Sequence, residues 1–225
     1  MDMSNPLYKN QGIHVDIATF SIEEGVVKVL LIMRGNAPFK GEWMMPGGAV
    51  YNNESTDNAA IRELKEKTGL EGVHLEQFYA FSDPNRDPRM RMISIGYLAL
   101  IDKNSVKILQ KTPKTINAEW FDINKIPPLV FDHNEILQKA LNELRKTITK
   151  TNLVKVLLSK EFTLVELQKI YEAILGNKFD RRNFRRKFLN LGLIKPTGSQ
   201  KEANGHRPAY FYRFADDEYK EIEIF

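Results

Sequence analysis

The pattern of apolar and polar positions in the first half of the chain predicts a mixture of strands and helices. Apolar, β-branched runs at residues 14–22 and 26–34 predict two strands joined by a turn at residues 23–25. Shorter runs predict four further strands, at residues 42–50, 73–81, 92–101 and 118–123. Strands and helices do not alternate strictly, so the pattern favours an α+β fold or an α/β sandwich over a doubly wound sheet.

Two amphipathic helices are predicted in the same half. Residues 56–67 form the first, and Gly69 is placed to end it in a left-handed conformation. Residues 132–148 form the second, where Asp132 and Glu135 have the spacing of a capping box. The basic, polar stretch 145–152 then predicts a linker between two domains, residues 1–149 and 150–225.

The second domain shows the pattern of a winged helix-turn-helix. Thr163 and Glu166 have capping-box spacing before a helix with an apolar residue on every third or fourth position, and Gly176 ends it. Asp180 is placed to cap a second helix, which Gly192 ends. Strands at 193–195 and 209–214, with a polar loop at 196–207, complete the pattern.

The second of these helices carries a basic face. At 100° per residue, Phe184, Phe188 and Leu191 fall on the expected core side, and Arg182 and Arg186 fall opposite them. Arginine and asparagine can contact base edges in a major groove, and flanking cations suit phosphates. The expected DNA contacts, including two in the wing, are Arg181, Arg182, Asn183, Arg185, Arg186, Lys187, Arg207 and Arg213. The alternative is a basic helix that is only solvated.

Charge is divided unevenly between the two halves. Residues 1–149 hold 18 basic and 19 acidic side chains, whereas residues 150–214 hold 14 basic and 5 acidic ones, followed by an acidic tail. This asymmetry is typical of a protein that brings one segment to nucleic acid. The chain has no cysteine, which excludes disulfides and thiolate zinc sites. With no membrane-length apolar run, we expect a cytoplasmic protein without a membrane partner.

Residues 48–70 carry the most specific chemistry. Gly48, Glu54, an Arg62-Glu63-Leu64 triplet, Glu66 and Gly69 resemble the Nudix box, except that Lys67 stands where the family has a second glutamate. Positions 63, 66 and 67 share one helix face, and such clustered carboxylates hold hard cations such as Mg²⁺. We therefore expect Glu63 and Glu66 to be residual catalytic and metal-binding residues, weakened by Lys67. The alternative for Lys67 is an ordinary i,i+4 helix pair with Glu63.

Other residues are expected to bind a ligand. The Gly47–Gly48 turn and Arg62 belong to the box, and the loop 83–91 adds three guanidinium groups suited to phosphate. That loop resembles the ADP-ribose pyrophosphatase-like branch of the Nudix family. The expected set is Gly47, Gly48, Arg62, Arg86, Arg89 and Arg91. A self-neutralised surface loop is the alternative for the last three. The four histidines are scattered without metal-ligand spacing, and His133 is expected to be structural.

Taken over nearly its whole length, the chain resembles the Nudix-related transcriptional regulators, which include controllers of NAD metabolism and of pentose use. The resemblance rests on the box and on Phe131-Asp132-His133, Phe162-Thr163-Leu164, residues 180–185 and residues 207–214. It implies a Nudix effector domain followed by a winged helix, a homodimer on operator DNA, and an effector such as ADP-ribose or a related phosphorylated sugar. Mg²⁺ is possible but not required.

Two other functions remain open. The first is a Mg²⁺-dependent pyrophosphohydrolase of ADP-ribose-type substrates with an accessory DNA-binding domain. The second, an RNA-associated Nudix protein, is weaker because no aromatic stacking platform is evident. The sequence leaves open the effector, the regulated genes and the direction of control.

Overall fold

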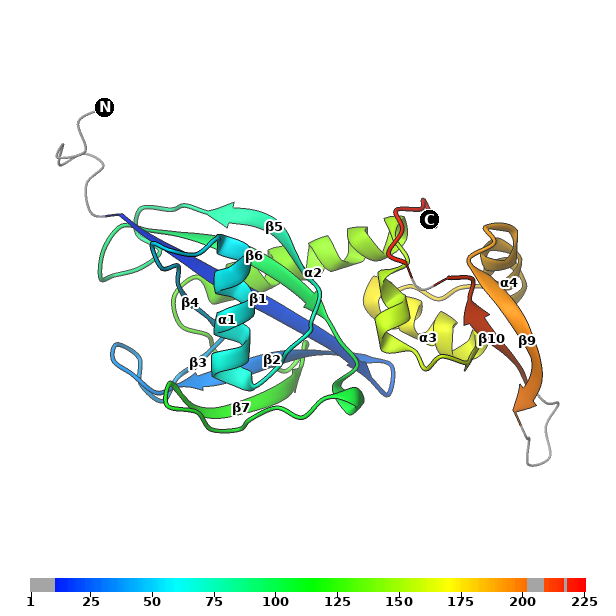
Figure 1. Ribbon diagram of the computed structural model, residues 1–225, viewed down its shortest axis with the longest axis horizontal. Coiled ribbons are helices and arrows are strands. Elements are labelled where there is room, and N and C mark those ends of the chain that lie inside the picture. Colours follow the sequence, from blue (N-terminus) through cyan, green and yellow to red (C-terminus); the bar gives the residue numbers. More distant parts are fainter. Residues whose placement is uncertain (1–10, 202–208, 217) are drawn as a thin grey trace. The chain divides into compact units, whose positions relative to one another are not determined.

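A computed structural model describes residues 11–201, 209–216 and 218–225 (Figure 1). Its contacts divide the chain into two compact units. The first includes residues up to Phe20, with Lys28–Ala99 and Asn104–Glu143; the second includes Ser21–Val27, Leu100–Lys103 and Leu144–Phe225. The division falls inside one helix, whose last residues lie at the boundary expected between positions 149 and 150.

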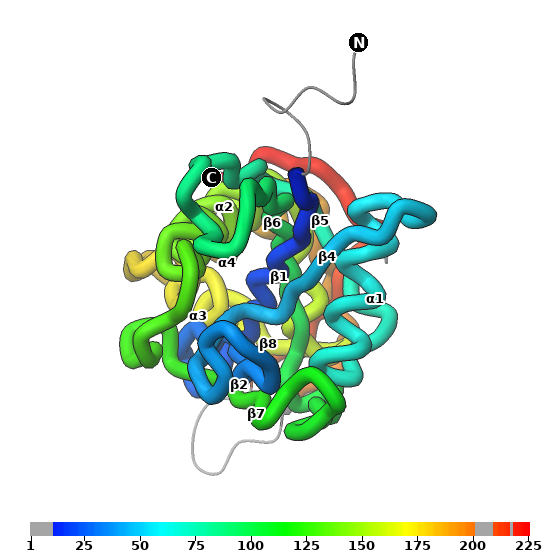
Figure 2. Tube along the Cα trace, turned by 90° about the vertical axis from the view of Figure 1, so that its left-hand side faces the viewer, coloured from blue at the N-terminus to red at the C-terminus, as the bar shows by residue number. Residues whose placement is uncertain are grey.

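The first unit is built on a mixed set of strands in the order β3-β2-β1-β6-β5, with β4 added to β1 and β7 added to β2. Helices α1 and α2 lie on opposite sides of these strands (Figure 2). Strands β1 and β2 are buried on both faces along most of their length, and Val15, Ile17, Val29 and Leu31 are fully buried. The strand bounds are β1 Gly12–Glu23, β2 Val26–Arg34, β3 Trp43–Met44, β4 Gly47–Ala49, β5 Leu75–Phe81, β6 Met92–Leu100 and β7 Thr115–Asp122. The expected α/β/α sandwich is confirmed.

The single strand expected at residues 42–50 is two short strands, β3 and β4, separated at Met45 and Pro46. Strand β4 pairs antiparallel with β1, so that Gly47 lies opposite Asp16. A Cβ atom added to Gly47 would lie 2.3 Å from the carbonyl oxygen of Val15, and one added to Gly48 would lie 2.3 Å from the carboxyl carbon of Glu63. The backbone of β1 leaves no room for a side chain at Gly47, and a side chain at Gly48 would displace the Glu63 carboxylate.

Helix α1 (Thr56–Thr68) forms where the apolar periodicity predicts it. Ser55 caps its N-terminus by accepting from the backbone N–H of Asn58, and Gly69 ends it with a φ of 76°. Helix α2 (His133–Lys150) also lies where the sequence predicts a helix, but the prediction that Asp132 and Glu135 form a capping box is wrong. Both carboxylate oxygens of Asp132 accept from the Arg86 guanidinium, at 2.7 and 2.8 Å, instead of capping the helix.

The linker expected at residues 145–152 is also wrong. Helix α2 continues to Lys150, with Ile148 fully buried, and a short 3-10 helix follows at Leu153–Leu157. The backbone N–H of Ile222 donates to the Lys150 carbonyl, and that of Ile224 donates to Thr149. The C-terminal segment thus satisfies carbonyl groups that a helix end leaves free, and the stretch is ordered structure rather than a spacer.

The second unit contains the expected winged helix. Its helices are α3 (Leu164–Leu175) and α4 (Arg181–Asn190), and its strands are β8 (Phe162–Thr163), β9 (Ile194–Lys201) and β10 (Ala209–Phe214) in the order β8-β10-β9. The Thr163 capping box and the Asp180 cap form as expected. The loop expected from residue 196 was too long, because β9 continues to Lys201 and pairs Pro196 with Tyr212.

The core of this unit differs from the expectation at one residue. Phe184 and Phe188 are buried against Tyr171, whereas Leu191 follows the helix and is 37% exposed. Phe225 instead contributes to this aromatic cluster, with its ring centroid 5.5 Å from that of Tyr171. Leu191 is the C-cap residue of α4 and keeps helical backbone angles, so helical periodicity alone does not determine which residues reach the core.

Candidate functional site

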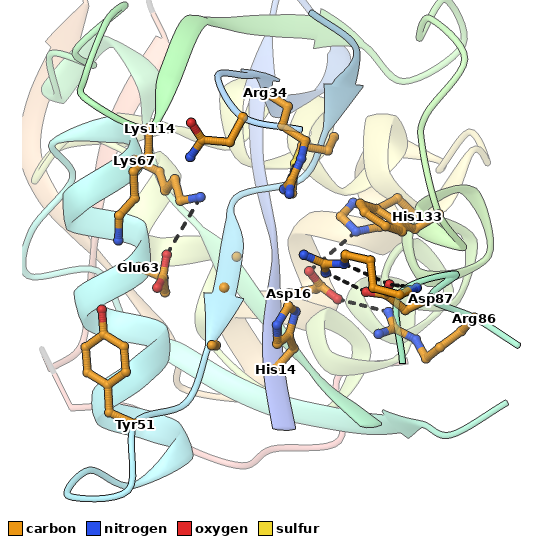
Figure 3. Close-up of a pocket in the computed structure, with 17 residues that line it drawn as sticks. His14, Asp16, Arg34, Tyr51, Glu63, Lys67, Arg86, Asp87, Lys114 and His133 are labelled. Atoms are coloured by element: carbon orange, nitrogen blue, oxygen red, sulfur yellow. Dashed lines mark hydrogen bonds and ion pairs between the residues drawn. The ribbon is translucent and has the colours of Figure 1, made fainter. Parts of the chain in front are cut away.

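A pocket in the first unit gathers most of the Nudix-box chemistry (Figure 3). Its volume of about 230 Å³ is slightly below that of most small-molecule sites, so it would hold the compact, charged part of a larger ligand. The lining residues come from strands β1 to β4, helix α1, the 83–91 loop, the start of α2 and the segments that flank these elements. They are His14, Asp16, Arg34, Asn36, Met44, Gly47, Gly48, Ala49, Tyr51, Glu63, Lys67, Arg86, Asp87, Arg89, Lys114, Phe131 and His133.

The charges of this lining favour an anion. Five lysine and arginine side chains face three carboxylates. The two histidines add no charge near neutral pH, because burial lowers the pKa of both His14 and His133. The pocket therefore carries an excess of two positive charges.

Arg62 holds the glutamates of the box in place. Its guanidinium donates to both carboxylate oxygens of Glu54, at 2.6 and 2.9 Å, and to Glu63 Oε1 at 2.6 Å. It also lies 3.9 Å from the ring centre of Tyr51. Hydrogen bonds from Arg62 lower the pKa of Glu54 to about 2, so this carboxylate is ionised throughout the physiological range. The structure thus places Arg62 behind the glutamates, as an orienting group beside the pocket.

Lys67 points into the pocket instead of out to solvent. Its side chain is 10% exposed, and its Nζ lies 3.9 Å from Glu63 Oε2 (Figure 3). Burial lowers the pKa of Lys67, while the carboxylate of Glu63 opposes that shift. Glu63 is itself buried, and its Oε2 has no hydrogen-bond partner among the described residues. The pair is therefore part of the pocket wall.

The second glutamate of the expected metal site lies apart from this pair. Glu66 is 38% exposed and outside the pocket lining, and its Oε2 accepts from Lys114 Nζ at 2.9 Å. Within the part of the chain that the structure describes, no three histidine or carboxylate side chains are placed to hold a metal ion together. The box carboxylates, each bound by a cation, do not fit a Mg²⁺ ion in this arrangement.

A buried ion network forms the opposite wall. The Arg86 guanidinium lies 3.2 Å from Asp16 Oδ2 and is bidentate to Asp132. Ser94 Oγ donates to the same Asp16 oxygen at 2.6 Å, and His133 Nε2 lies 3.5 Å from the other. Burial raises the pKa of Asp16, but its contacts with His133, Arg86 and the Ser94 hydroxyl outweigh burial and lower it. Arg86, expected as a ligand contact, is thus committed largely to carboxylates, although it still borders the pocket.

The other two arginines of the 83–91 loop take different places. Arg89 borders the pocket and pairs with Asp87, with two guanidinium contacts at 2.6 and 2.9 Å. Arg91 is outside the lining, and its guanidinium donates to the carbonyl oxygens of Ser82 and Asp83. The loop is partly self-neutralised, and only Arg86 and Arg89 of the three are positioned beside the pocket.

Several lining residues were not expected from the sequence. His14, Arg34, Lys114, Phe131 and His133 come from four separate segments, and pairing between strands brings them together. His14 and His133, which were expected only to lack metal-ligand spacing, both border this pocket. His133 has a structural contact as well, because its Nδ1 accepts from the backbone N–H of Met45 at 2.9 Å. Among these lining residues, only those of the Phe131-Asp132-His133 triplet were indicated by the sequence, through the family resemblance.

The second unit presents a separate, basic surface on α4. Every position expected to contact DNA on this helix is exposed, whereas Phe184 and Phe188 anchor its other face. Asp180 caps the helix, and Arg186 donates to the side chain of Asn183 at 3.0 Å. The exposed residues are Arg181, Arg182, Asn183, Arg185, Arg186 and Lys187. This helix can present arginine forks and an amide to base edges while its core contacts keep it rigid.

The remaining expected contacts lie in the wing. Arg213 is exposed on β10, where it pairs with Lys195 of β9 across the ladder. Arg207 lies outside the described residues. Among the helices that the structure does describe, none combines the length and the apolar character that crossing a membrane requires.

Comparison with known families agrees with this two-part organisation. Residues 12–140 match the model of the NUDIX domain, and residues 154–214 match the model of the NrtR DNA-binding winged helix domain. The first match covers more than half of the chain.

Similar proteins extend over both parts. The chain is 37% identical to the ADPR responsive transcriptional repressor NtrR of Acinetobacter baylyi, over 94% of this chain and 85% of that protein. The crystal structure of Shewanella oneidensis NrtR complexed with a 27mer DNA is 29% identical, with a TM-score of 0.76, covering 90% of this chain and 93% of the other. The NUDIX domain of the same NrtR, in a cocrystal structure with ADP ribose, is 29% identical with a TM-score of 0.57. The match covers 62% of this chain and 93% of the other. The chain therefore belongs to the NrtR family of regulators, in which a NUDIX domain precedes a DNA-binding winged helix.

Proposed function

We propose that this protein is a transcriptional repressor whose NUDIX domain binds ADP-ribose, or a closely related sugar diphosphate, and thereby changes the affinity of its winged helix for operator DNA. The observation that carries the proposal is the presence in one chain of an anion-selective pocket and an exposed arginine-rich α4. The similar repressor of Acinetobacter baylyi and the ADP-ribose and DNA complexes of Shewanella oneidensis NrtR support both parts.

The pocket suits a diphosphate because its cations come from different directions. Arg34 and Arg89 both lie within 6 Å of the Phe131 ring, at 5.7 and 5.5 Å, so the ring holds these two guanidinium groups beside the cavity. Lys67 and Lys114 come from the opposite side. A doubly charged diphosphate matches the two excess positive charges of the lining, whereas a neutral pentose does not.

The protein is proposed to act as a homodimer in the cytoplasm, with one α4 in each half of a palindromic operator. Two winged helices would then enter major grooves about one helical turn, or roughly 34–36 Å, apart. In this arrangement Arg182 and Arg186 read bases, and Arg185 and Lys187 position the helix on phosphates. We propose that the DNA-binding domain comprises residues 150–225 and the effector domain residues 1–149.

Thermal unfolding of the full chain tests the effector assignment. ADP-ribose at a hundred times its dissociation constant stabilises a single-site protein by about 2.7 kcal/mol, which raises Tm measurably. We expect ADP-ribose to raise Tm, and ribose and arabinose at the same concentration to leave it unchanged. A rise with a pentose but none with ADP-ribose would contradict the effector class.

A pyrophosphohydrolase is the second candidate function, favoured by one observation: Glu54, Arg62 and Glu63 keep a tight, mutually bonded geometry. The cation beside each glutamate of the box argues against it. Mg²⁺-dependent release of AMP from ADP-ribose near the enzyme median of about 10 s⁻¹ would favour the hydrolase over the sensor.

A further inference from the structure

Three cations from separate elements border the part of the pocket where a Nudix box places its metal. Lys67 comes from the last turn of α1. Arg34 ends β2, and Lys114 immediately precedes β7. The antiparallel pairing of β2 and β7 continues beyond Arg34, because the backbone N–H of Gly35 donates to the Lys114 carbonyl at 3.2 Å. The fold therefore holds the backbones next to Arg34 and Lys114 together, and Lys67 of α1 points into the same part of the pocket (Figure 3).

The carboxylates near these cations are engaged in a way that leaves little room for a divalent ion. Glu63 Oε1 accepts from Arg62, and Glu66 Oε2 accepts from Lys114. Lys67 Nζ lies beside the remaining oxygen of Glu63. A Mg²⁺ ion on Glu63 would have to approach a buried ammonium, and like charges repel strongly where water is excluded.

Within the described structure, two of the three cations, Lys67 and Arg34, lack a carboxylate within hydrogen-bond distance. Lys67 Nζ is 3.9 Å from Glu63 Oε2, which is an ion pair but is beyond hydrogen-bond distance. Among residues 11–201, 209–216 and 218–225, Lys67 has no hydrogen-bond acceptor and Arg34 pairs with no carboxylate. Arg34 donates instead to the carbonyl oxygens of Ala37 and Pro38. A nine-tenths buried ammonium whose N–H donors have no acceptor within hydrogen-bond distance in the described part of the chain is expected to find one in a bound ligand, and its charge favours an anion.

We propose that Lys67, together with Arg34 and Lys114, occupies the role of the divalent cation in this Nudix domain, so that the diphosphate group of the effector binds without metal. The ammonium of Lys67 would supply, from the protein itself, positive charge to the non-bridging oxygens of the diphosphate, which carry its negative charge. This inference rests on the proposed function and specifies how its site recognises the ligand.

This arrangement has a functional consequence. A lysine neutralises a diphosphate and holds it, but it does not supply a metal-bound water as nucleophile. Lys67 therefore favours binding over turnover, which is what a sensor requires. It also makes occupancy follow the effector concentration alone, without dependence on the free Mg²⁺ concentration.

The test is calorimetric titration of the full chain with ADP-ribose in two buffers, one with excess EDTA and one with excess Mg²⁺. We expect the same Kd in both. A Kd at least about tenfold weaker in EDTA, equivalent to 1.4 kcal/mol, would overturn the inference while leaving the proposed function intact. No binding in either buffer would overturn the proposed function and this inference with it.

Two variants test whether metal-independent binding of ADP-ribose depends on Lys67. Lys67→Met keeps an unbranched apolar stem but removes the charge, and we expect a Kd about tenfold to a hundredfold weaker in EDTA, the value of a charged hydrogen bond. In Lys67→Glu, added Mg²⁺ should recover binding that EDTA abolishes. Lys65→Glu is the matched control, because Lys65 lies on the same helix, is 58% exposed and pairs with Glu71 away from the pocket. Wild-type affinity of Lys67→Met in EDTA, with unchanged thermal unfolding, would overturn the inference.

Discussion

Lys67 Nζ lies 3.9 Å from Glu63 Oε2, across one turn of α1, and the two side chains are 10% and 4% exposed. An i,i+4 pair on a helix surface contributes only about 0.3–0.5 kcal/mol. This pair is different because it is removed from solvent and faces a cavity. The i,i+4 pair of the alternative does form, but it is buried in the pocket wall, where the lysine changes the chemistry of the box.

Hydrolysis should be weak in the wild-type protein and increase in Lys67→Glu. The substitution removes the ammonium from the glutamate face and restores a carboxylate at the position where the Nudix box has one. Release of AMP from ADP-ribose at several Mg²⁺ concentrations measures this. Equal, metal-independent rates in both proteins would contradict the role assigned to position 67, and Lys65→Glu controls for helix charge.

We expect Arg86 to contribute more to the free energy of unfolding than to ligand binding. Arg86→Ala leaves Asp16 buried without its charge partner, and breaking a buried ion pair typically costs about 3–5 kcal/mol. Arg91→Ala is the matched change, because Arg91 bonds only exposed backbone carbonyls and should cost no more than about 1 kcal/mol. Urea unfolding of both variants compares them. Similar losses would show that the Asp16–Arg86–Asp132 network does not stabilise the fold.

Stability should fall as the pH drops below about 6.5, the ordinary pKa of histidine. Burial lowers the pKa of His14 and His133 in the folded protein, so the unfolded chain takes up protons first as the pH falls. Each such histidine adds at most about 1.4 kcal/mol per pH unit to the slope, and its contribution is fully present above pH 6.5.

Unfolding free energies from pH 5 to pH 8 measure this slope. His133→Asn keeps an acceptor for the Met45 N–H. It should reduce the slope of unfolding free energy against pH by at most the equivalent of one proton, about 1.4 kcal/mol per pH unit. His74→Asn is the control, because His74 is 52% exposed. A wild-type stability that rises between pH 6.5 and pH 5 would contradict the prediction.

Arg182→Ala and Arg186→Ala should each weaken specific DNA binding by about 1–3 kcal/mol and relax specificity at one position per half-site. Both side chains are exposed, so folding should be unaffected. Arg185→Ala and Lys187→Ala should weaken binding to all DNA sequences alike. Each should also reduce the slope of log affinity against log salt concentration by about one unit. Lys169→Ala, an exposed cation on α3, is the control.

The measurement is fluorescence anisotropy at two salt concentrations. It uses a duplex that the protein has selected from a random library, and a scrambled duplex. Equal affinity for both duplexes, unchanged by Arg182→Ala and Arg186→Ala, would show that α4 is only a solvated basic surface.

Local patterns were sufficient to predict the helices and most strands. Ser55, Gly69, Thr163 and Asp180 act through contacts within a few residues, so their roles follow from spacing alone. Asp132 shows the limit of that reasoning. It has capping-box spacing with Glu135, but Arg86, 46 positions earlier in the chain, takes its carboxylate. A tertiary ion pair has overridden a local preference, and no local pattern contains that information.

The pocket could be predicted only in part for the same reason. The residues of the Nudix box are close in sequence, and their spacing indicated the site. Arg34 and Lys114 are 80 positions apart and meet because β2 pairs with β7. Strand order is a property of the whole fold, so single residues at strand ends carry no signal of their own in one sequence.

The central claim is that the pocket and the DNA-binding surface are coupled. It is tested most directly by measuring the Kd of ADP-ribose by calorimetry with and without saturating selected duplex, and the Kd of the duplex with and without saturating ADP-ribose. Coupling between two binding sites is reciprocal, so both ratios must be equal, typically about 5-fold to 150-fold. The account predicts that ADP-ribose weakens duplex binding and that the duplex weakens ADP-ribose binding by that same factor. Binding of both ligands with unchanged affinities would contradict it.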